Sequence, residues 1–167
     1  MKRLMTLAVF ASAIPMAFAD SWEYREDVDK MTSKTTAFAT LSSINSLSLS
    51  FPYKGSNYGQ LMVRKHPQYG LHVMVSIDKG QILCPTYSGC SVQVRFGNRP
   101  PVTFQGSAPA DHSSTSVFIR GAQGFIEHAK KAKSIKVQLN VYQSGAEVLE
   151  FDSDEPLVWG PKVKPAK

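Results

Sequence analysis

The residues that carry most acid–base and nucleophilic chemistry in proteins are few and scattered in this chain. Of the four histidines, only His112 adjoins both an acid and a hydroxyl, in the run Asp111-His112-Ser113-Ser114. A catalytic triad needs side chains that converge in space, whereas neighbours on an extended chain point in opposite directions. We interpret the run as a solvated loop and keep a hydrolase that uses His112 or His72 as an alternative hypothesis.

Motifs typical of enzymes and cofactor sites are missing from the sequence. It contains no G-x-S-x-G nucleophile motif, no H-E-x-x-H zinc motif, no phosphate-binding loop and no Gly-rich dinucleotide fingerprint. The acidic run 147–155 lacks the D-x-D-x-D-G spacing of a calcium loop. We therefore expect no catalytic residues, no metal site and no cofactor, and a protein that is not an enzyme.

The first nineteen residues have the pattern of an export signal. Lys2 and Arg3 precede an apolar stretch at residues 4–14, and the Ala-Phe-Ala of residues 17–19 fits the small-x-small cleavage rule. A membrane anchor is the alternative, but Pro15 interrupts the apolar stretch, which is too short to span a bilayer. We predict cleavage after Ala19 and a periplasmic or secreted protein without a transmembrane segment.

The predicted periplasmic or secreted location decides how the two cysteines, Cys84 and Cys90, are interpreted. Two nearby cysteines usually pair in an oxidising compartment. The Pro-Thr-Tyr-Ser-Gly segment between them has a turn-forming composition that can bring its ends together. A redox or nucleophilic cysteine is the alternative, but the five intervening residues do not fit a C-x-x-C motif. We predict a Cys84–Cys90 disulfide.

Charge is distributed unevenly along the chain, whose formal net charge is +6. Residues 30–146 carry thirteen Lys or Arg and three Asp or Glu, a net of +10, while acids gather in residues 20–29 and 147–155. This central part attracts anionic partners unless the acidic segments fold back and neutralise it, and both alternatives stay open. We predict a basic binding surface made of Arg64, Lys65, Arg95, Arg99, Lys130, Lys131, Lys133 and Lys136.

Period-two alternation of apolar residues is the main structural signal. It is clearest at 46–51, 71–78, 91–96 and 135–142, and weaker strands are expected at 35–41, 60–65, 101–105, 115–120, 147–152 and 157–159. One wet and one dry face per strand is typical of antiparallel sheets. Helical spacing occurs once, at 122–134. The pattern predicts an antiparallel β-sandwich with one short helix, as a single domain of residues 20–159 followed by a flexible basic tail at 160–167.

Short motifs connect the chain to known proteins. Trp22 precedes Asp29-Lys30-Met31-Thr32, followed by the predicted strands Leu61-Met62-Val63-Arg64 and Val92-Gln93-Val94-Arg95-Phe96. In this layout the chain resembles exported bacterial proteins of unassigned function, some in prophage or plasmid regions. It is also similar to the TagO/VasI type of protein associated with type VI secretion. The resemblance covers residues 22–96 and implies no functional residue here. The chain lacks the cysteine-rich N-terminal part of that family.

These patterns together favour a periplasmic, non-enzymatic binding or accessory protein. Its expected partner is an envelope protein or an anionic envelope surface. Nucleic acid is not expected, because an exported protein rarely meets it and no recognition motif is present. Two alternatives remain: an inhibitor or immunity protein against an envelope-acting enzyme, and the hydrolase. The sequence leaves the oligomeric state open.

Overall fold

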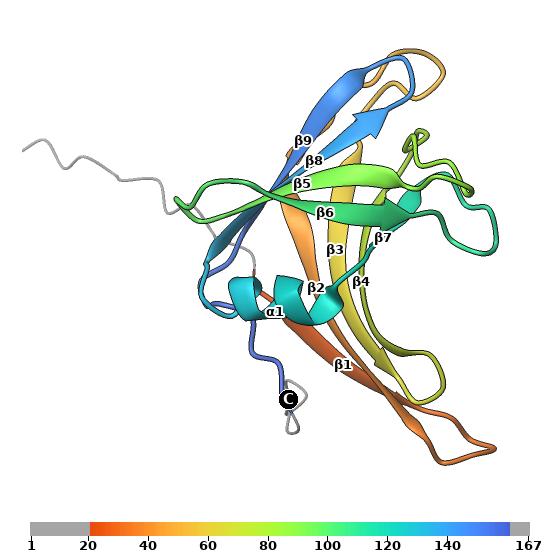
Figure 1. Ribbon diagram of the computed structural model, residues 1–167, viewed down its shortest axis with the longest axis vertical. Coiled ribbons are helices and arrows are strands. Elements are labelled where there is room, and N and C mark those ends of the chain that lie inside the picture. Colours follow the sequence, from red (N-terminus) through yellow and green to blue (C-terminus); the bar gives the residue numbers. More distant parts are fainter. Residues whose placement is uncertain (1–20, 161–167) are drawn as a thin grey trace, which may run out of the picture.

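The computed structural model describes residues 21–160 as nine strands and one short helix, which confirms the predicted mainly β class (Figure 1). The predicted signal peptide at 1–19, its cleavage site after Ala19 and residues 161–167 of the predicted tail lie outside the described residues. The elements, in chain order, are β1 (Glu23–Val28), β2 (Thr35–Ser46), β3 (Tyr58–His66), β4 (Gly70–Ile77), β5 (Cys90–Phe96), β6 (Val102–Ser107), β7 (Ser116–Ile119), α1 (Ala122–Ala129), β8 (Ser134–Val141) and β9 (Gly145–Asp152).

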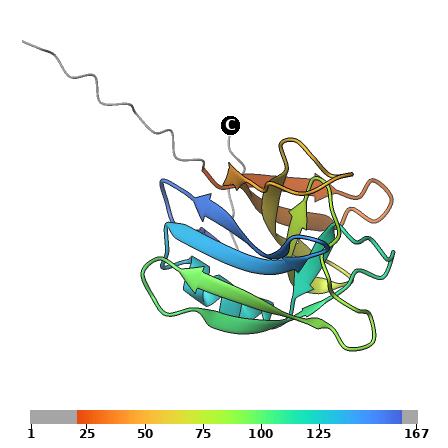
Figure 2. The ribbon, with the colours of Figure 1, turned by 90° about the horizontal axis from the view of Figure 1, so that it is seen from above.

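All nine strands belong to one antiparallel sheet in the order β1-β2-β3-β4-β7-β6-β5-β8-β9. The sheet folds over on itself, so that β1, β2, β3, β4 and β7 form a first layer against a second layer of β6, β5, β8 and β9 (Figures 1 and 2). The fold-over lies where β6 meets β7 through two residue pairs. One continuous sheet therefore makes both layers of the predicted sandwich.

Alternation along each strand decides which side chains enter the space between the layers. In β8 the buried side chains occupy every second position: Ile135, Val137, Leu139 and Val141. Val73 and Val75 do the same in β4, and Val92 and Val94 in β5. Burying such side chains stabilises the fold by about 25 cal/mol for each Å² of apolar surface removed from water. A single apolar core results between the layers.

The two layers meet again where the end of β2 lies beside β9. The first half of β2 pairs with β1, and a bulge interrupts its pairing with β3 between Ser42 and Ser46. Within the bulge, the Asn45 Nδ2 donates to the Val148 carbonyl oxygen at 2.9 Å, and the Asn45 Oδ1 accepts the Glu150 N–H at 2.8 Å. A carboxamide side chain thus supplies the donor and acceptor that a neighbouring strand would offer, and closes the sheet.

Helix α1 covers the other end of the interior. Phe125 and Ile126 are buried, and the Phe125 ring centroid lies 5.1 Å from that of Phe96 and 5.7 Å from that of Phe104. The predicted helix is confirmed but ends at Ala129 instead of residue 134. The chain turns there into β8, because the Ala132 N–H donates to the Ala129 carbonyl in a tighter turn.

Some predicted strand boundaries are wrong. No strand covers residues 46–51: β2 ends at Ser46, and the Leu47 N–H donates to the Asn57 carbonyl in an irregular segment. Leu47 and Leu49 are nevertheless buried, so the alternation reports burial without strand pairing. No strand forms at 157–159 either, whereas the largely exposed β1 has no apolar alternation to reveal it.

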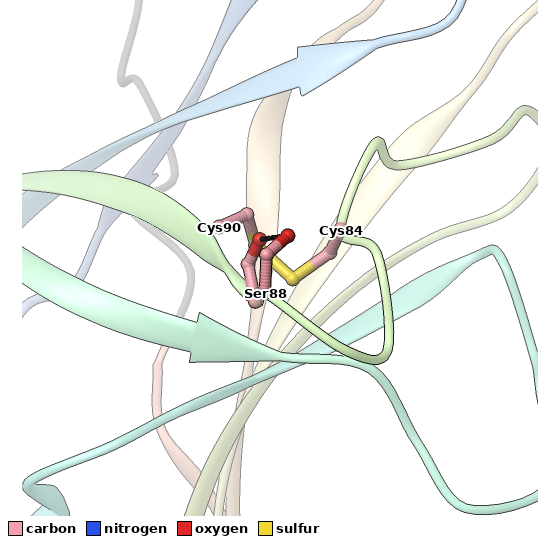
Figure 3. The surroundings of a disulfide bond; sticks show 4 residues. Cys84, Ser88 and Cys90 are labelled. Carbon is pink, nitrogen blue, oxygen red and sulfur yellow. Dashed lines mark hydrogen bonds between the residues drawn. A yellow bond between two sulfur atoms is a disulfide. The ribbon is translucent and has the colours of Figure 1, made fainter.

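The predicted disulfide between Cys84 and Cys90 is present, with an Sγ–Sγ distance of 2.10 Å (Figure 3). It joins the segment after Ile82, which forms a β-bridge with Val141, to the start of β5. The Gly89 N–H donates to the Pro85 carbonyl oxygen of the same loop, at a distance of 2.7 Å. The loop between the cysteines is therefore closed at its base.

Two glycines give a matched test of how tightly the closed end is packed. A Cβ on Gly59 of β3 would lie 2.5 Å from the buried Leu149 side chain, whereas a Cβ on Gly124 of α1 would meet nothing within 4 Å. Gly59→Ala should lower the free energy of unfolding by about 1–3 kcal/mol, because it overpacks the core. Gly124→Ala should raise it by about 0.5–1 kcal/mol, because alanine favours a helix over glycine. Urea denaturation measures both, and equal effects would contradict the packing at the closed end.

Candidate functional site

The eight residues of the predicted basic surface lie on two different layers. Arg64 and Lys65 lie on β3 in the first layer. Arg95 of β5 and Lys136 of β8 are register partners in the second layer. The others lie on the turn after β5 and around the segment between α1 and β8: Arg99, Lys130, Lys131 and Lys133. The structure brings Arg95 and Lys136 together, and it places Arg64 and Lys65, consecutive residues of β3, on opposite faces of the first layer.

Ion pairs reduce the positive charge of the group formed by the six other basic residues, those outside β3. The Lys136 Nζ lies 2.8 Å from the Glu150 carboxylate, and the Lys130 Nζ lies 3.2 Å from the Glu127 carboxylate. Glu150 belongs to the acidic run at 147–155, so this run folds back onto part of the basic region. Such partly exposed pairs contribute little to stability. They nevertheless leave this group less attractive to an anionic partner than its sequence implies.

The first layer has an outward face that combines basic, methionine and aromatic side chains. Its buried residues alternate with these, so the residues between them point away from the core. Strand register arranges the outward side chains in two rows that cross the layer. We call the seven residues the Arg–Met face: Arg25, Phe38, Arg64 and His72 in one row, and Met62, Met74 and Phe118 in the other.

Two arginines flank Phe38 in the first row. The Arg25 guanidinium carbon lies 4.7 Å from the Phe38 ring centroid, a favourable cation–π geometry, and Arg25 also pairs with Asp27 at 3.2 Å. Arg64 lies opposite Phe38 on the next strand and makes no ion pair within residues 21–160. The Arg64 charge is therefore available to a partner.

His72 lies opposite Arg64 and beside Phe118, with ring centroids 5.5 Å apart. Burial lowers the pKa of His72 below its ordinary value of 6.5, and the positive charges of Arg64 and His66 lower it further. The His72 Nδ1 is buried and has no hydrogen-bond partner among the described residues. An unpaired buried nitrogen favours the neutral ring, because a charged imidazolium has two donors to satisfy.

A hollow lies at each end of the Arg–Met face. The first, of about 490 Å³, is lined by Arg25, Phe38 and Met62 among residues of β1, β2 and β3. The second, of about 440 Å³, is lined by His72 and Phe118 together with residues just before α1. Glu23 also lines the first hollow and Arg120 the second, so apolar side chains meet charges of both signs in the first and a positive charge in the second.

The residues of the hydrolase hypothesis do not converge among residues 21–160. The Asp111 Oδ1 accepts the Ser113 N–H at 3.0 Å, and the Ser113 hydroxyl lies 3.2 Å from that of Thr115. No hydrogen bond of the described chain joins the His112 side chain to either neighbour, and His72 faces an arginine and an aromatic ring. Within the same residues, no three His, Cys, Asp or Glu side chains gather as metal ligands.

Comparisons with known proteins identify no relative of the chain. A scan of protein-family models, a search of curated proteins and a search of solved structures each found no match. None of the helices in the described part of the chain has the length and apolarity needed to cross a membrane. The function must therefore be inferred from the geometry of this chain.

Sequence reasoning identified one member of the Arg–Met face, Arg64, as a binding residue and missed the rest. Alternation correctly assigns His72 and Met74 to the outward side of β4 but treats that side as solvated. The missed signal is the residue types at outward positions: Phe38, Met62, Met74 and Phe118 stand where a solvated strand carries polar residues.

The environment of His72 predicts a pH effect. A nuclear magnetic resonance titration should give His72 a pKa below 6.5, and Arg64→Gln should raise it, because one neighbouring positive charge is removed. Between the lowered pKa and 6.5 the unfolded chain binds more protons at this site than the folded chain does. The His72 contribution to stability is therefore present above pH 6.5 and is lost as the pH falls through the lowered pKa. A His72 pKa at or above 6.5, or one that Arg64→Gln leaves unchanged, would contradict this environment.

Proposed function

We propose that the chain is an exported, non-enzymatic binding or accessory protein that holds another protein of the cell envelope on its Arg–Met face. The observation that carries the proposal is the pair of outward rows, in which Arg25, Arg64 and His72 lie beside Met62, Met74 and Phe118. Protein interfaces are enriched in arginine, methionine and aromatic residues in their central parts. Solvated strand faces are not enriched in these residues.

An acidic protein partner suits the charge of this face. Arg64 has no ion pair among the described residues, whereas Lys130 at the end of α1 and Lys136 of β8 are paired. Residues 21–160 as a whole carry fourteen Lys or Arg against twelve Asp or Glu, so the attraction of an acidic partner would come from the unpaired Arg64 and not from the net charge of the chain. The partner would contribute carboxylates to the arginines and apolar side chains to the methionines and rings.

An envelope location agrees with two separate features. The Cys84–Cys90 disulfide suits an oxidising compartment such as the periplasm. Residues 1–19 have the charge and apolar pattern of an export signal. Together they support a binding protein that works outside the cytoplasm.

Capture of partners from the envelope tests the proposal. A tagged chain is cross-linked in its own cells and recovered at low and at high salt, beside the variants Arg64→Glu and Met74→Asp. Each variant should lower recovery of a discrete protein at least about tenfold, because one reverses the unpaired charge and the other places a charge among the apolar contacts. High salt should also weaken capture by wild type.

Arg99→Glu is the matched control, because it reverses an exposed arginine in the turn between β5 and β6, two strands of the second layer. It should leave capture of the same protein nearly unchanged. Loss of capture with Arg99→Glu and full capture with Arg64→Glu would move the binding site to the second layer and overturn the assignment to the Arg–Met face.

A further inference from the structure

Four connections meet at the end of the sheet away from α1 (Figure 1). They join β2 to β3, β4 to β5, β6 to β7 and β8 to β9, and they take up residues 47–57, 78–89, 108–115 and 142–144. None of the residues on the Arg–Met face belongs to them. We call this region the loop end.

Hydrogen bonds hold the connections of the loop end against one another. The Asn57 Nδ2 donates to the Lys79 carbonyl at 2.8 Å, and the Asn57 Oδ1 accepts the Lys79 N–H at 3.0 Å. The Gln81 Nε2 donates to the Tyr53 hydroxyl at 2.9 Å, and the Gln81 carbonyl accepts the Tyr142 N–H at 2.9 Å. The loop end is therefore a pre-organised surface.

Large apolar and aromatic side chains project from this surface into solvent. Tyr87 is 94% exposed and Phe51 is 75% exposed, while Leu83 and Tyr142 are each 47% exposed. Tyr87 lies in the loop closed by the disulfide, which ties the loop to β5 (Figure 3). Leaving side chains of this size in water is unfavourable, so a surface that takes them up would stabilise its contact with the loop end.

Two lysines accompany the exposed rings. A Cβ on Gly55 would lie 3.9 Å from the Lys79 Nζ, so the Lys79 ammonium lies beside the residue that follows Lys54. Both lysines are exposed and make no ion pair within residues 21–160. The acids of the same end are engaged: Asp78 accepts the Tyr58 N–H and Asp111 accepts the Ser113 N–H. The four connections therefore carry two positive and two negative formal charges, and the lysines supply local contacts beside Gly55 without a net positive charge of the loop end.

We propose that the loop end docks on the surface of an anionic phospholipid bilayer. Phe51, Leu83, Tyr87 and Tyr142 enter the interfacial layer, where aromatic side chains are favoured, and Lys54 and Lys79 contact lipid phosphates. Side chains that project from separate loops fit a fluid surface, which adapts to them, whereas a folded protein partner needs a matching hollow for each. This inference is independent of the Arg–Met face, which lies on the strands and stays free when the loop end is docked.

Sedimentation with vesicles tests the inference on the chain purified from the envelope. Phosphatidylglycerol–phosphatidylcholine vesicles should bind it, and vesicles of phosphatidylcholine alone should bind it more weakly. Phe51→Ser with Tyr87→Ser should lower the vesicle-bound fraction about tenfold, because both interfacial contacts are lost. Lys54→Gln with Lys79→Gln should remove the preference for phosphatidylglycerol and most of the salt dependence.

Met31→Ser with Tyr69→Ser is the matched control. These side chains are 92% and 61% exposed, and they lie at the β1–β2 and β3–β4 turns, at the other end of the strands. This pair should bind vesicles as wild type does. Should the Phe51/Tyr87 pair lower the melting temperature, Leu83→Ser with Tyr142→Ser provides a second test of the same surface.

Absence of wild-type sedimentation with phosphatidylglycerol vesicles would overturn the inference, as would an equal loss in the Met31/Tyr69 control. If vesicles fail to bind but the Phe51/Tyr87 pair loses a cross-linked protein, the loop end serves a protein partner and the bilayer assignment is wrong. Failure of the vesicle experiment would leave the protein-capture experiment on the Arg–Met face unaffected, because that experiment measures the effects of Arg64→Glu and Met74→Asp.

Discussion

The closure of the sheet by Asn45 is the constraint on which the other features depend. Its carboxamide joins the end of β2 to the backbone of β9 through one donated and one accepted hydrogen bond. Beside it, the buried Ser43 hydroxyl donates to the Asn45 carbonyl and accepts the Gly59 N–H. This contact joins the layers beside the packing of Leu149 of β9 against Gly59 of β3, and together they keep water from the apolar side chains between the layers.

Closure also decides which surfaces remain for partners. Once the inward side chains fill the interior, the Arg–Met face and the loop end each combine large apolar groups with basic side chains that make no ion pair within residues 21–160. One lies on the strands of the first layer and the other on the connections between strands. In our two proposals taken together, the chain would hold a protein on its sheet while its loops rest on a membrane, the arrangement expected of an accessory protein in the envelope.

Sequence reasoning recovered the features that follow from local patterns. Alternation located β4, β5 and β8. The predicted periplasmic or secreted location, together with a short turn-forming segment, identified the Cys84–Cys90 pair. Alternation at 46–51 gave a wrong strand prediction. Leu47 and Leu49 are buried at every second position, but the segment that carries them pairs with no strand. Asn45 and the Arg–Met face could not be predicted, because both depend on which strands become neighbours, and residues 45 and 150 are far apart in the chain.

Amide hydrogen exchange at Glu150 tests the closure most directly. If the Asn45 Oδ1 accepts this N–H, it should exchange slowly in wild type, and Asn45→Ala should speed its exchange about tenfold, as expected for the loss of one hydrogen bond. Asn140→Ala, which alters an exposed asparagine of β8, should leave Glu150 protected. Fast exchange of the Glu150 amide in wild type, or protection that survives Asn45→Ala, would contradict the closed sheet.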